Sequence, residues 1–423
     1  MESGLAVQDV RRTDLDWVRI GAFLLLIFYH VGVFYAPGPT AVGAISPRPL
    51  PWLVIPMLLV NPWRLLVLFV VSGAATRFLS DKMSPGALFK SRSARLLIPL
   101  LFGILVVVPP QCFVQVIERC GYSGNYFNYW EAYLKADQHL CPAGPHLIVP
   151  TYNHLWFVWY LWLFTVLLAL VLSAFPNVLT RMQRVIERAL SGWGLVLWPA
   201  CWLAFAWLAH RFPGNPIADL YAYAIYIPAF LCGYFIAKSD VIWMRIDGVR
   251  WRVLAGALLS FCSMIGLAFV ALGAPGGWGA AQMTASHSGL RILELRTIGA
   301  AVYGLNQWLW ILAVFGFAHH TLINRDGPIR RYLTEAIFPF YIIHQTTIEV
   351  VGHYLAKDRL PLGIEATLLI GATIASCFLT YEVARRIRPL RPLFGLKPAT
   401  ASRSHSPAKD WQIARGLNSD DTA

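Results

Sequence analysis

The chain has 423 residues, of which 57% are hydrophobic and only 13% are charged, and its formal net charge is +13. Soluble domains have about 25% charged residues, so this composition excludes a string of ordinary soluble domains and indicates a protein embedded in lipid. The positive charge does not indicate nucleic-acid binding, because the basic residues stand in short segments between apolar runs, where they orient a membrane protein.

Apolar runs of about 20 residues predict an all-α, polytopic integral membrane protein with about ten transmembrane helices. Asn61-Pro62 interrupts the second run, so we expect a surface segment there, followed by a helix from about Trp63. One membrane domain is expected over 1–396, and a polar, disordered tail over 397–423. The expected spans are 17–36, 52–79, 95–114, 154–175, 192–210, 221–237, 251–273, 297–320, 334–355 and 363–385.

The distribution of Lys and Arg predicts the orientation of these spans. If the N-terminus is cytoplasmic and the sides alternate, about 26 of the 35 Lys and Arg residues lie in the cytoplasm. This asymmetry predicts an even number of spans and two cytoplasmic termini. The long loop 115–153 is then external, and a disulfide between Cys120 and Cys141 is possible there if the compartment is oxidising.

The first expected span carries two ionisable residues on one face. Arg19 and His30 are eleven residues apart, which is close to three helical turns and a rise of about 16 Å. Asp16 lies near the same face and could pair with Arg19. Singly, Arg19 could be a cytoplasmic anchor and His30 a structural histidine. Together they favour a functional site, because ionisable residues in membranes face the bundle interior or a wet cavity.

Other polar residues at the ends or centres of spans are candidates as well. His344 lies at the centre of the ninth span, where a neutral imidazole needs a hydrogen-bond partner. His154 and Trp156 open the fourth span on the external side and are candidates for substrate binding, although His154 could simply be a polar residue at a helix start. Arg92 and Arg95, at the cytoplasmic mouth of the third span, are candidates for binding phosphate groups, or else mark the cytoplasmic side.

Several common catalytic and binding motifs are missing from the sequence. It contains no phosphate-binding P-loop, no G-x-S-x-G elbow and no H-E-x-x-H zinc motif. The seven cysteines include no Cys-x-x-Cys pair and no zinc-ligand spacing. We therefore expect no metal site.

Five short blocks occur in order over most of the chain: 15–19 with His30, 68–73, 92–99, 154–157 and 340–345. In these blocks the chain resembles the acyltransferase type 3 family of membrane O-acyltransferases, and within it most closely the glucan-biosynthesis protein C group of succinyltransferases. In many members of the family a Glu follows the His-x-Trp segment, whereas here Phe157 follows Trp156. That departure separates the chain from relatives that carry an additional esterase-like domain.

The resemblance implies that a succinyl or acetyl group passes from cytoplasmic acyl-CoA to a hydroxyl of a periplasmic or cell-surface glycan, across a bacterial inner membrane. The resemblance makes His30 the catalytic histidine and assigns Arg19 and His344 to the catalytic site as well. The implied partners are acyl-CoA as donor substrate, the glycan acceptor and the lipid bilayer, with no bound cofactor and no nucleic acid. A thioester is already activated, so a neutral histidine suffices as general base. A transiently acylated histidine remains the alternative.

Two other functions stay open at this point. Intramembrane histidines could be proton relays of a transporter or polysaccharide exporter, but neither an internal repeat nor an acidic residue in the middle of a span is evident. A lipid-linked sugar transferase would need acidic residues in external loops, for which Glu118, Glu131 and Asp137 are available.

Overall fold

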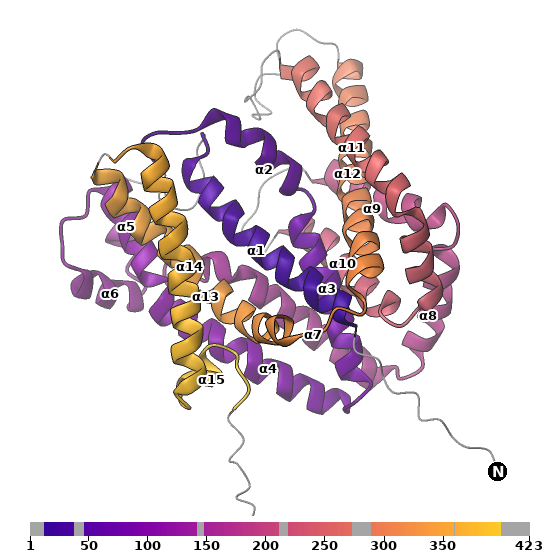
Figure 1. Cartoon of the computed structure of the whole chain (residues 1–423), viewed down its shortest axis with the longest axis horizontal. Helices are drawn as coiled ribbons and strands as arrows, with labels where there is room; N and C mark the ends of the chain where they lie inside the picture. The colour runs from indigo at the N-terminus through magenta and orange to yellow at the C-terminus, as the bar shows by residue number, and fades with distance from the viewer. Residues whose placement is uncertain are drawn as a thin grey trace, which may run out of the picture.

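The computed structural model describes residues 12–37, 46–141, 148–210, 219–272, 289–358 and 360–398, and these residues form helices and connecting loops without a strand. The α-helices, drawn in Figure 1, are α1 (Thr13–Tyr35), α2 (Val54–Val60), α3 (Arg64–Ser80), α4 (Pro85–Phe102), α5 (Pro109–Cys120), α6 (Tyr126–Leu134), α7 (Trp156–Ala174), α8 (Val178–Ala189), α9 (Gly194–Ala209), α10 (Leu220–Ile236), α11 (Asp240–Leu272), α12 (Gly289–Leu322), α13 (Pro328–Lys357), α14 (Leu362–Arg386) and α15 (Leu390–Leu393). Short 3-10 turns precede α2 (Pro51–Leu53), follow α6 (Gln138–Leu140) and precede α7 (Asn153–Leu155), and a π-helical stretch (Gly103–Val107) joins α4 to α5.

Every expected span coincides with a helix, which confirms an all-helical membrane protein. Within the described residues, seven helical segments are long and apolar enough to cross a membrane, or eight if the bent pair Arg181–Ala189 and Gly194–Ala209 is one span. The short α10 and the more polar α13 are not among them. The number of about ten spans and the cytoplasmic termini therefore stay predictions. The expected disorder of 397–423 falls almost wholly outside the described residues.

Local sequence explains where the helices begin and break. The expected interruption at Asn61-Pro62 is confirmed, since α2 ends at Val60 and α3 begins at Arg64. The third span begins earlier than expected, because the Ser84 hydroxyl accepts a hydrogen bond from the Ala87 N–H and caps α4 ahead of its apolar part. A polar first turn carries no apolar signal, so the apolar run alone places the start too late.

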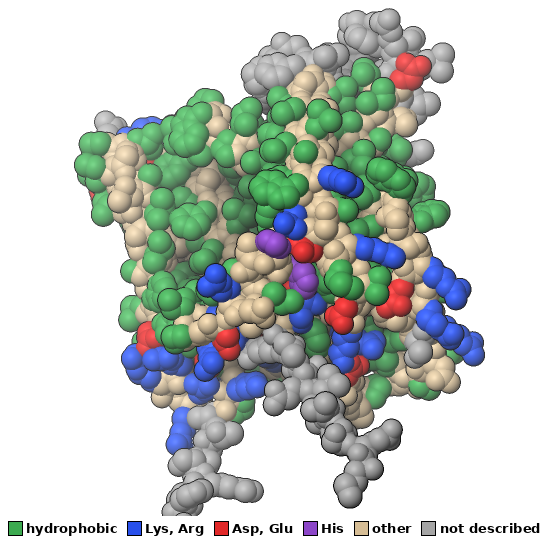
Figure 2. All heavy atoms as spheres, turned by 45° about the vertical axis from the view of Figure 1, so that its right-hand side comes forward, with side chains coloured by type: hydrophobic (Ala, Val, Ile, Leu, Met, Phe, Trp, Pro, Cys, Tyr) green, Lys and Arg blue, Asp and Glu red, His purple; other side chains and the backbone are tan. Residues whose placement is uncertain are grey.

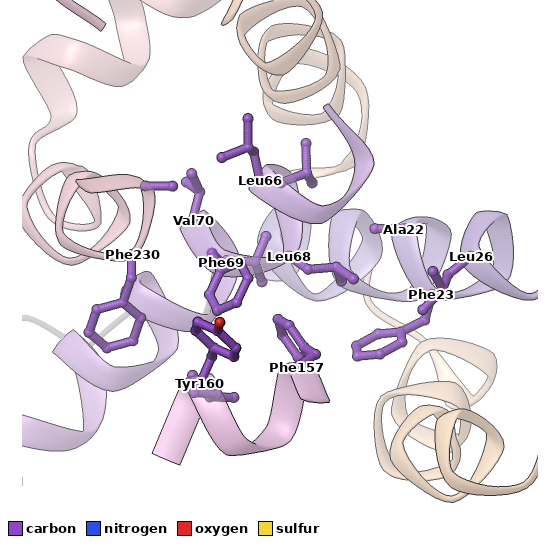
Figure 3. Packing of buried hydrophobic residues seen from close by; sticks show 14 of the residues in the cluster. Ala22, Phe23, Leu26, Leu66, Leu68, Phe69, Val70, Phe157, Tyr160 and Phe230 are labelled. Atoms are coloured by element: carbon purple, nitrogen blue, oxygen red, sulfur yellow. The ribbon is translucent and has the colours of Figure 1, made fainter. Parts of the chain in front are cut away.

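α1 runs through the middle of the bundle and packs against α3, α12 and α13 (Figure 1). Aromatic rings fill the space between α1, α3 and α7: the Phe69 ring lies 4.7 Å from that of Phe157, which in turn lies 6.1 Å from that of Phe23 (Figure 3). Because lipid tails are as apolar as these side chains, close packing rather than exclusion from water holds the helices together. The position of α1 is thus fixed from several sides.

The closest helix contact joins α3 and α10 through two glycines. A methyl group at Gly73 would lie 1.8 Å from the carbonyl oxygen of Phe230, and one at Gly233 would lie 1.9 Å from that of Val70. Both distances are far below any van der Waals contact with backbone. Only glycine permits this approach, as in other membrane bundles whose interfaces are built from small residues.

A disulfide joins Cys120, the last residue of α5, to Cys141, as the sequence allowed. Basic residues gather at the other end of the molecule, where Lys238 lies 2.5 Å from Asp81 and Arg391 donates to the carbonyl of Arg385. Lys and Arg side chains accumulate toward the lower end of the face in Figure 2, below a largely hydrophobic band. This is the arrangement expected of a membrane protein with one basic side.

We predict that Gly73→Ala lowers the free energy of unfolding by about 1–3 kcal/mol, because α3 and α10 must separate to admit the methyl group. Thermal unfolding of purified protein in detergent measures the effect. Gly21→Ala is the matched control, since nothing lies within 4 Å of the added methyl group and the residue is exposed. Equal unfolding temperatures for the two variants would contradict the close approach.

For the orientation, we predict that a reporter fused after Gly395 lies in the cytoplasm. A reporter active only in the cytoplasm should give signal at this position, and one active only in the periplasm should stay silent. The opposite pattern would place the basic end of the bundle outside and reverse the orientation given to every loop.

Candidate active site

The centre of the bundle holds a pair of histidines from α1 and α13. The Nε2 atom of His344 lies 3.1 Å from the Nδ1 atom of His30. The Nδ1 atom of His344 lies 2.8 Å from the carbonyl oxygen of Tyr341, one turn earlier in α13. His344 is fully buried, whereas His30 keeps some exposure. The structure therefore brings together two of the three residues expected to be catalytic and supplies the partner that His344 needs.

These contacts fix where the protons of a neutral pair reside. A carbonyl oxygen only accepts, so Nδ1 of His344 carries a proton and donates it to Tyr341. Nε2 of His344 then holds a lone pair and accepts the N–H of His30 Nδ1. The remaining nitrogen of His30, Nε2, is left unprotonated. A nitrogen with a free lone pair on the partly exposed ring is what a general base or a nucleophile requires.

His154 lies beside this pair, with its ring centroid 5.4 Å from that of His344. Its Nε2 donates to the carbonyl of Ile342 at 3.0 Å, and its Nδ1 accepts from the Gln111 amide at 3.3 Å. The Tyr341 hydroxyl also donates to the backbone carbonyl of His154 at 2.5 Å. Both ring nitrogens of His154 are thus hydrogen-bonded to protein groups, and these bonds hold His154 against α13 next to the histidine pair. Substrate binding by His154 stays a prediction.

Trp156 is half-buried at the start of α7. Its ring lies 5.6 Å from that of Tyr226 and 5.5 Å from that of Tyr160, so it belongs to an aromatic wall between α7 and α10. A contact of this wall with substrate is likewise a prediction.

A row of polar side chains extends from the histidines along the interface of α5 and α13. The Gln111 amide donates to the Thr346 hydroxyl at 3.2 Å, and the Gln115 amide donates to Glu349 at 3.0 Å. These contacts were not identified from the sequence. Glu349, which is only 1% exposed, lies in the last third of α13 and so outside the middle of the span, where no acidic residue was expected. Residues 111, 115 and 118 recur at helical spacing on one face of α5, and this recurrence was the available signal.

Three arginines gather where α1 and α4 approach the basic end of the molecule. The charge of Arg95 acts on Arg19, and the charges of both act on Arg92. Arg92 is 8% exposed and donates from Nη2 to the Thr76 hydroxyl at 3.2 Å, while its Nε has no hydrogen-bond partner. The structure thus adds Arg19 to the expected pair of Arg92 and Arg95. A concentration of positive charge of this kind suits a polyanionic ligand.

Asp16 forms its ion pair across the bundle. Its carboxylate accepts from the buried guanidinium of Arg330 in α13, and its charge also acts on Arg19. The expected interaction of Asp16 with Arg19 is thus only one part of the environment of Asp16. Helical spacing indicates neighbours on the same helix but cannot reveal a stronger partner on another one.

Within the described ranges no group of three or more His, Cys, Asp or Glu side chains could hold a metal ion.

A family model described as an acyltransferase domain matches residues 12–382. The chain belongs to this acyltransferase family. It is similar to the glucans biosynthesis protein C of Shigella boydii serotype 4, with 23% identity over 398 residues that cover 92% of this chain and 95% of the relative. The proteins of that name from Escherichia coli O81 and O6:K15:H31 match with the same identity and coverage. No solved structure shows significant similarity to the chain.

Membership of the family confirms the resemblance seen in the five sequence blocks and makes the protein a membrane acyltransferase. It decides for an acyltransferase over the transporter and the sugar transferase. The matched region includes His30 and His344, so the buried pair lies inside the acyltransferase domain.

Proposed function

We propose that this acyltransferase moves an acyl group from cytoplasmic acyl-CoA to a hydroxyl of a glycan on the other side of the membrane. The observation that carries the proposal is the hydrogen bond from His30 to His344, which leaves Nε2 of His30 unprotonated and oriented by α13. General base catalysis on a hydroxyl needs a nitrogen in this state.

In the proposed step, the acceptor hydroxyl oxygen attacks the thioester carbonyl carbon, and its proton passes to Nε2 of His30. A C–O bond forms, and the carbonyl electron pair moves onto oxygen. The intermediate then collapses, the C–S bond breaks, and the CoA sulfur leaves with the proton from the imidazolium. His344 keeps the imidazolium oriented by accepting its Nδ1–H throughout. The products are an ester and free CoA, and the histidine pair returns to its starting state.

Arg19, Arg92 and Arg95 support a donor site at the basic end of the molecule, because paired guanidinium groups bind phosphates well. Arg19 precedes His30 by about 16 Å along α1. The long pantetheine arm of CoA is suited to such a separation, with its phosphates at the arginines and its thioester at the histidines. The donor then enters from the side that carries most of the basic residues.

For the acceptor, the relatives provide the guide. Their name assigns them to the biosynthesis of glucans. An acceptor of this kind needs a polar route to His30, and the side chains between α5 and α13 offer hydrogen-bonding groups along one, ending at His353 and Glu118, which lie 2.5 Å apart. We propose a glycan hydroxyl as acceptor, and a succinyl group ahead of acetyl as the group transferred.

We predict that His30→Ala abolishes acyl transfer and that His30→Gln lowers it by roughly 10²–10⁴-fold, because glutamine can hydrogen-bond but cannot take up the proton. Transfer of label from acyl-labelled succinyl-CoA to glucan by the purified protein measures the effect. His139→Gln is the control, since that side chain is 92% exposed in the 3-10 turn after α6. Wild-type activity in His30→Gln would rule out this histidine as the base.

We also predict that Arg92→Ala and Arg95→Ala raise the apparent KM for acyl-CoA several-fold and leave that for the glycan unchanged, because a guanidinium that contacts phosphate is lost. Initial rates with each substrate varied in turn separate the two constants. Lys90→Ala is the matched control, an exposed cation on the same helix. The donor site is misassigned if only the acceptor KM moves.

A further inference from the structure

Another arginine lies deep in the bundle, apart from Arg19, Arg92 and Arg95 at the basic end. Arg64, the first residue of α3, is only 6% exposed. Its Cζ atom lies 3.4 Å from the ring centroid of Tyr29 in α1. Its Nη1 donates to the side-chain oxygen of Asn61, which also accepts from the Tyr29 hydroxyl at 3.1 Å. The guanidinium is thus held firmly against α1.

The charge of Arg64 has no counter-ion in the described part of the chain. No Asp or Glu there forms a salt bridge with it, and its contacts with the Asn61 side chain and the Tyr29 ring are contacts with neutral groups. Its Nε is buried and has no hydrogen-bond partner. A buried cation left unpaired is costly, so a guanidinium held in this way indicates a site for an anion that arrives from outside the chain.

Arg64 is close to the proposed general base. Tyr29 precedes His30, and their ring centroids are 6.0 Å apart. Together with the stacking of Arg64 on Tyr29, this places the guanidinium within roughly 10 Å of the imidazole, a range over which charges act on each other even in salt solution. The charge of Arg64 does act on His30. The guanidinium is therefore close enough to His30 for an anion bound at Nε to be part of the same substrate.

Building on the acyl transfer proposed above, we propose that Arg64 binds the free carboxylate of a dicarboxylic acyl group and thereby selects that group over neutral acyl groups. A four-carbon diacid bound as a thioester places its free carboxylate carbon only about 4 Å from the reacting carbonyl carbon. The edge of a guanidinium that includes Nε pairs with a carboxylate through two parallel hydrogen bonds. Arg64 would then determine specificity without taking part in proton transfer.

The test compares two acyl donors in the absence of acceptor. Purified full-length protein in lipid nanodiscs is given succinyl-CoA or acetyl-CoA, and release of free CoA by hydrolysis is followed. Arg64→Gln should lower kcat/KM for succinyl-CoA by roughly 10- to 100-fold, the effect of losing a hydrogen bond between charged groups. Hydrolysis of acetyl-CoA should change far less than that of succinyl-CoA, because an acetyl group has no carboxylate for Arg64 to bind. Arg64→Lys should recover part of the loss, because it restores the charge but not the paired geometry.

Arg77→Gln is the matched control, since Arg77 also lies on α3 and has its Cζ 5.2 Å from the Tyr234 ring, but pairs with Asp81 at the opposite end. Arg77→Gln should leave the preference between succinyl-CoA and acetyl-CoA unchanged. Equal losses for both donors in Arg64→Gln would overturn the inference and give Arg64 a role common to all acyl groups. A loss seen only after glucan is added would also overturn it, because the anion would then belong to the acceptor.

The inference can fail separately from the proposed function. If the wild-type protein uses neither acyl-CoA, with or without glucan, the proposed acyl transfer is wrong, and a binding measurement decides the role of Arg64. Monomethyl succinate should then raise the unfolding temperature of the wild type more than methyl butyrate does, and Arg64→Gln should remove that difference. An identical response of wild type and variant would leave Arg64 without a carboxylate ligand.

Discussion

The arrangement of the active site depends on one constraint: a polar side chain inside a lipid-embedded bundle must find its hydrogen-bond partner within the protein. α13 meets this need with its own backbone, since the carbonyls of Tyr341 and Ile342 each accept from a histidine ring. A carbonyl cannot titrate or turn away, so it fixes both the tautomer and the orientation of the ring. The state of His30 follows from that, because His344 can only accept from it.

α1 positions the other residues of the site. Its packing against α3, α12 and α13 determines the rotation of the helix, and the same rotation directs both Arg19 and His30 inward. Arg64 also depends on α1, because it rests on Tyr29. α3, which begins at Arg64, packs against α1 on one side and against α10 through Gly73 and Gly233. The packing of α1 and α3 therefore sets the positions of Arg19, His30 and Arg64 together.

Relations along one helix could be predicted from the sequence, and relations between helices could not. The spacing of Arg19 and His30, the break at Asn61-Pro62 and the helical character of each span follow from local periodicity and backbone chemistry. The bond between His30 and His344 joins residues 314 positions apart, and periodicity carries no information about which faces meet. Arg64 reads as an ordinary basic residue at a helix start until its burial and its lack of a counter-ion are known.

A neutral partner for the proposed general base is compatible with burial in a membrane-embedded bundle. An ionised aspartate behind His30 would stabilise the imidazolium more strongly, but burying that charge in a low-dielectric bundle costs several kcal/mol unless it is fully paired. His344 avoids this cost and still orients the ring through a single acceptor. The weaker base that results would be adequate for the proposed thioester donor, whose carbonyl is already activated. The carboxylate that is buried near the site, Glu349, accepts from the amides of Gln115 and Gln345 and so stays in the supporting structure.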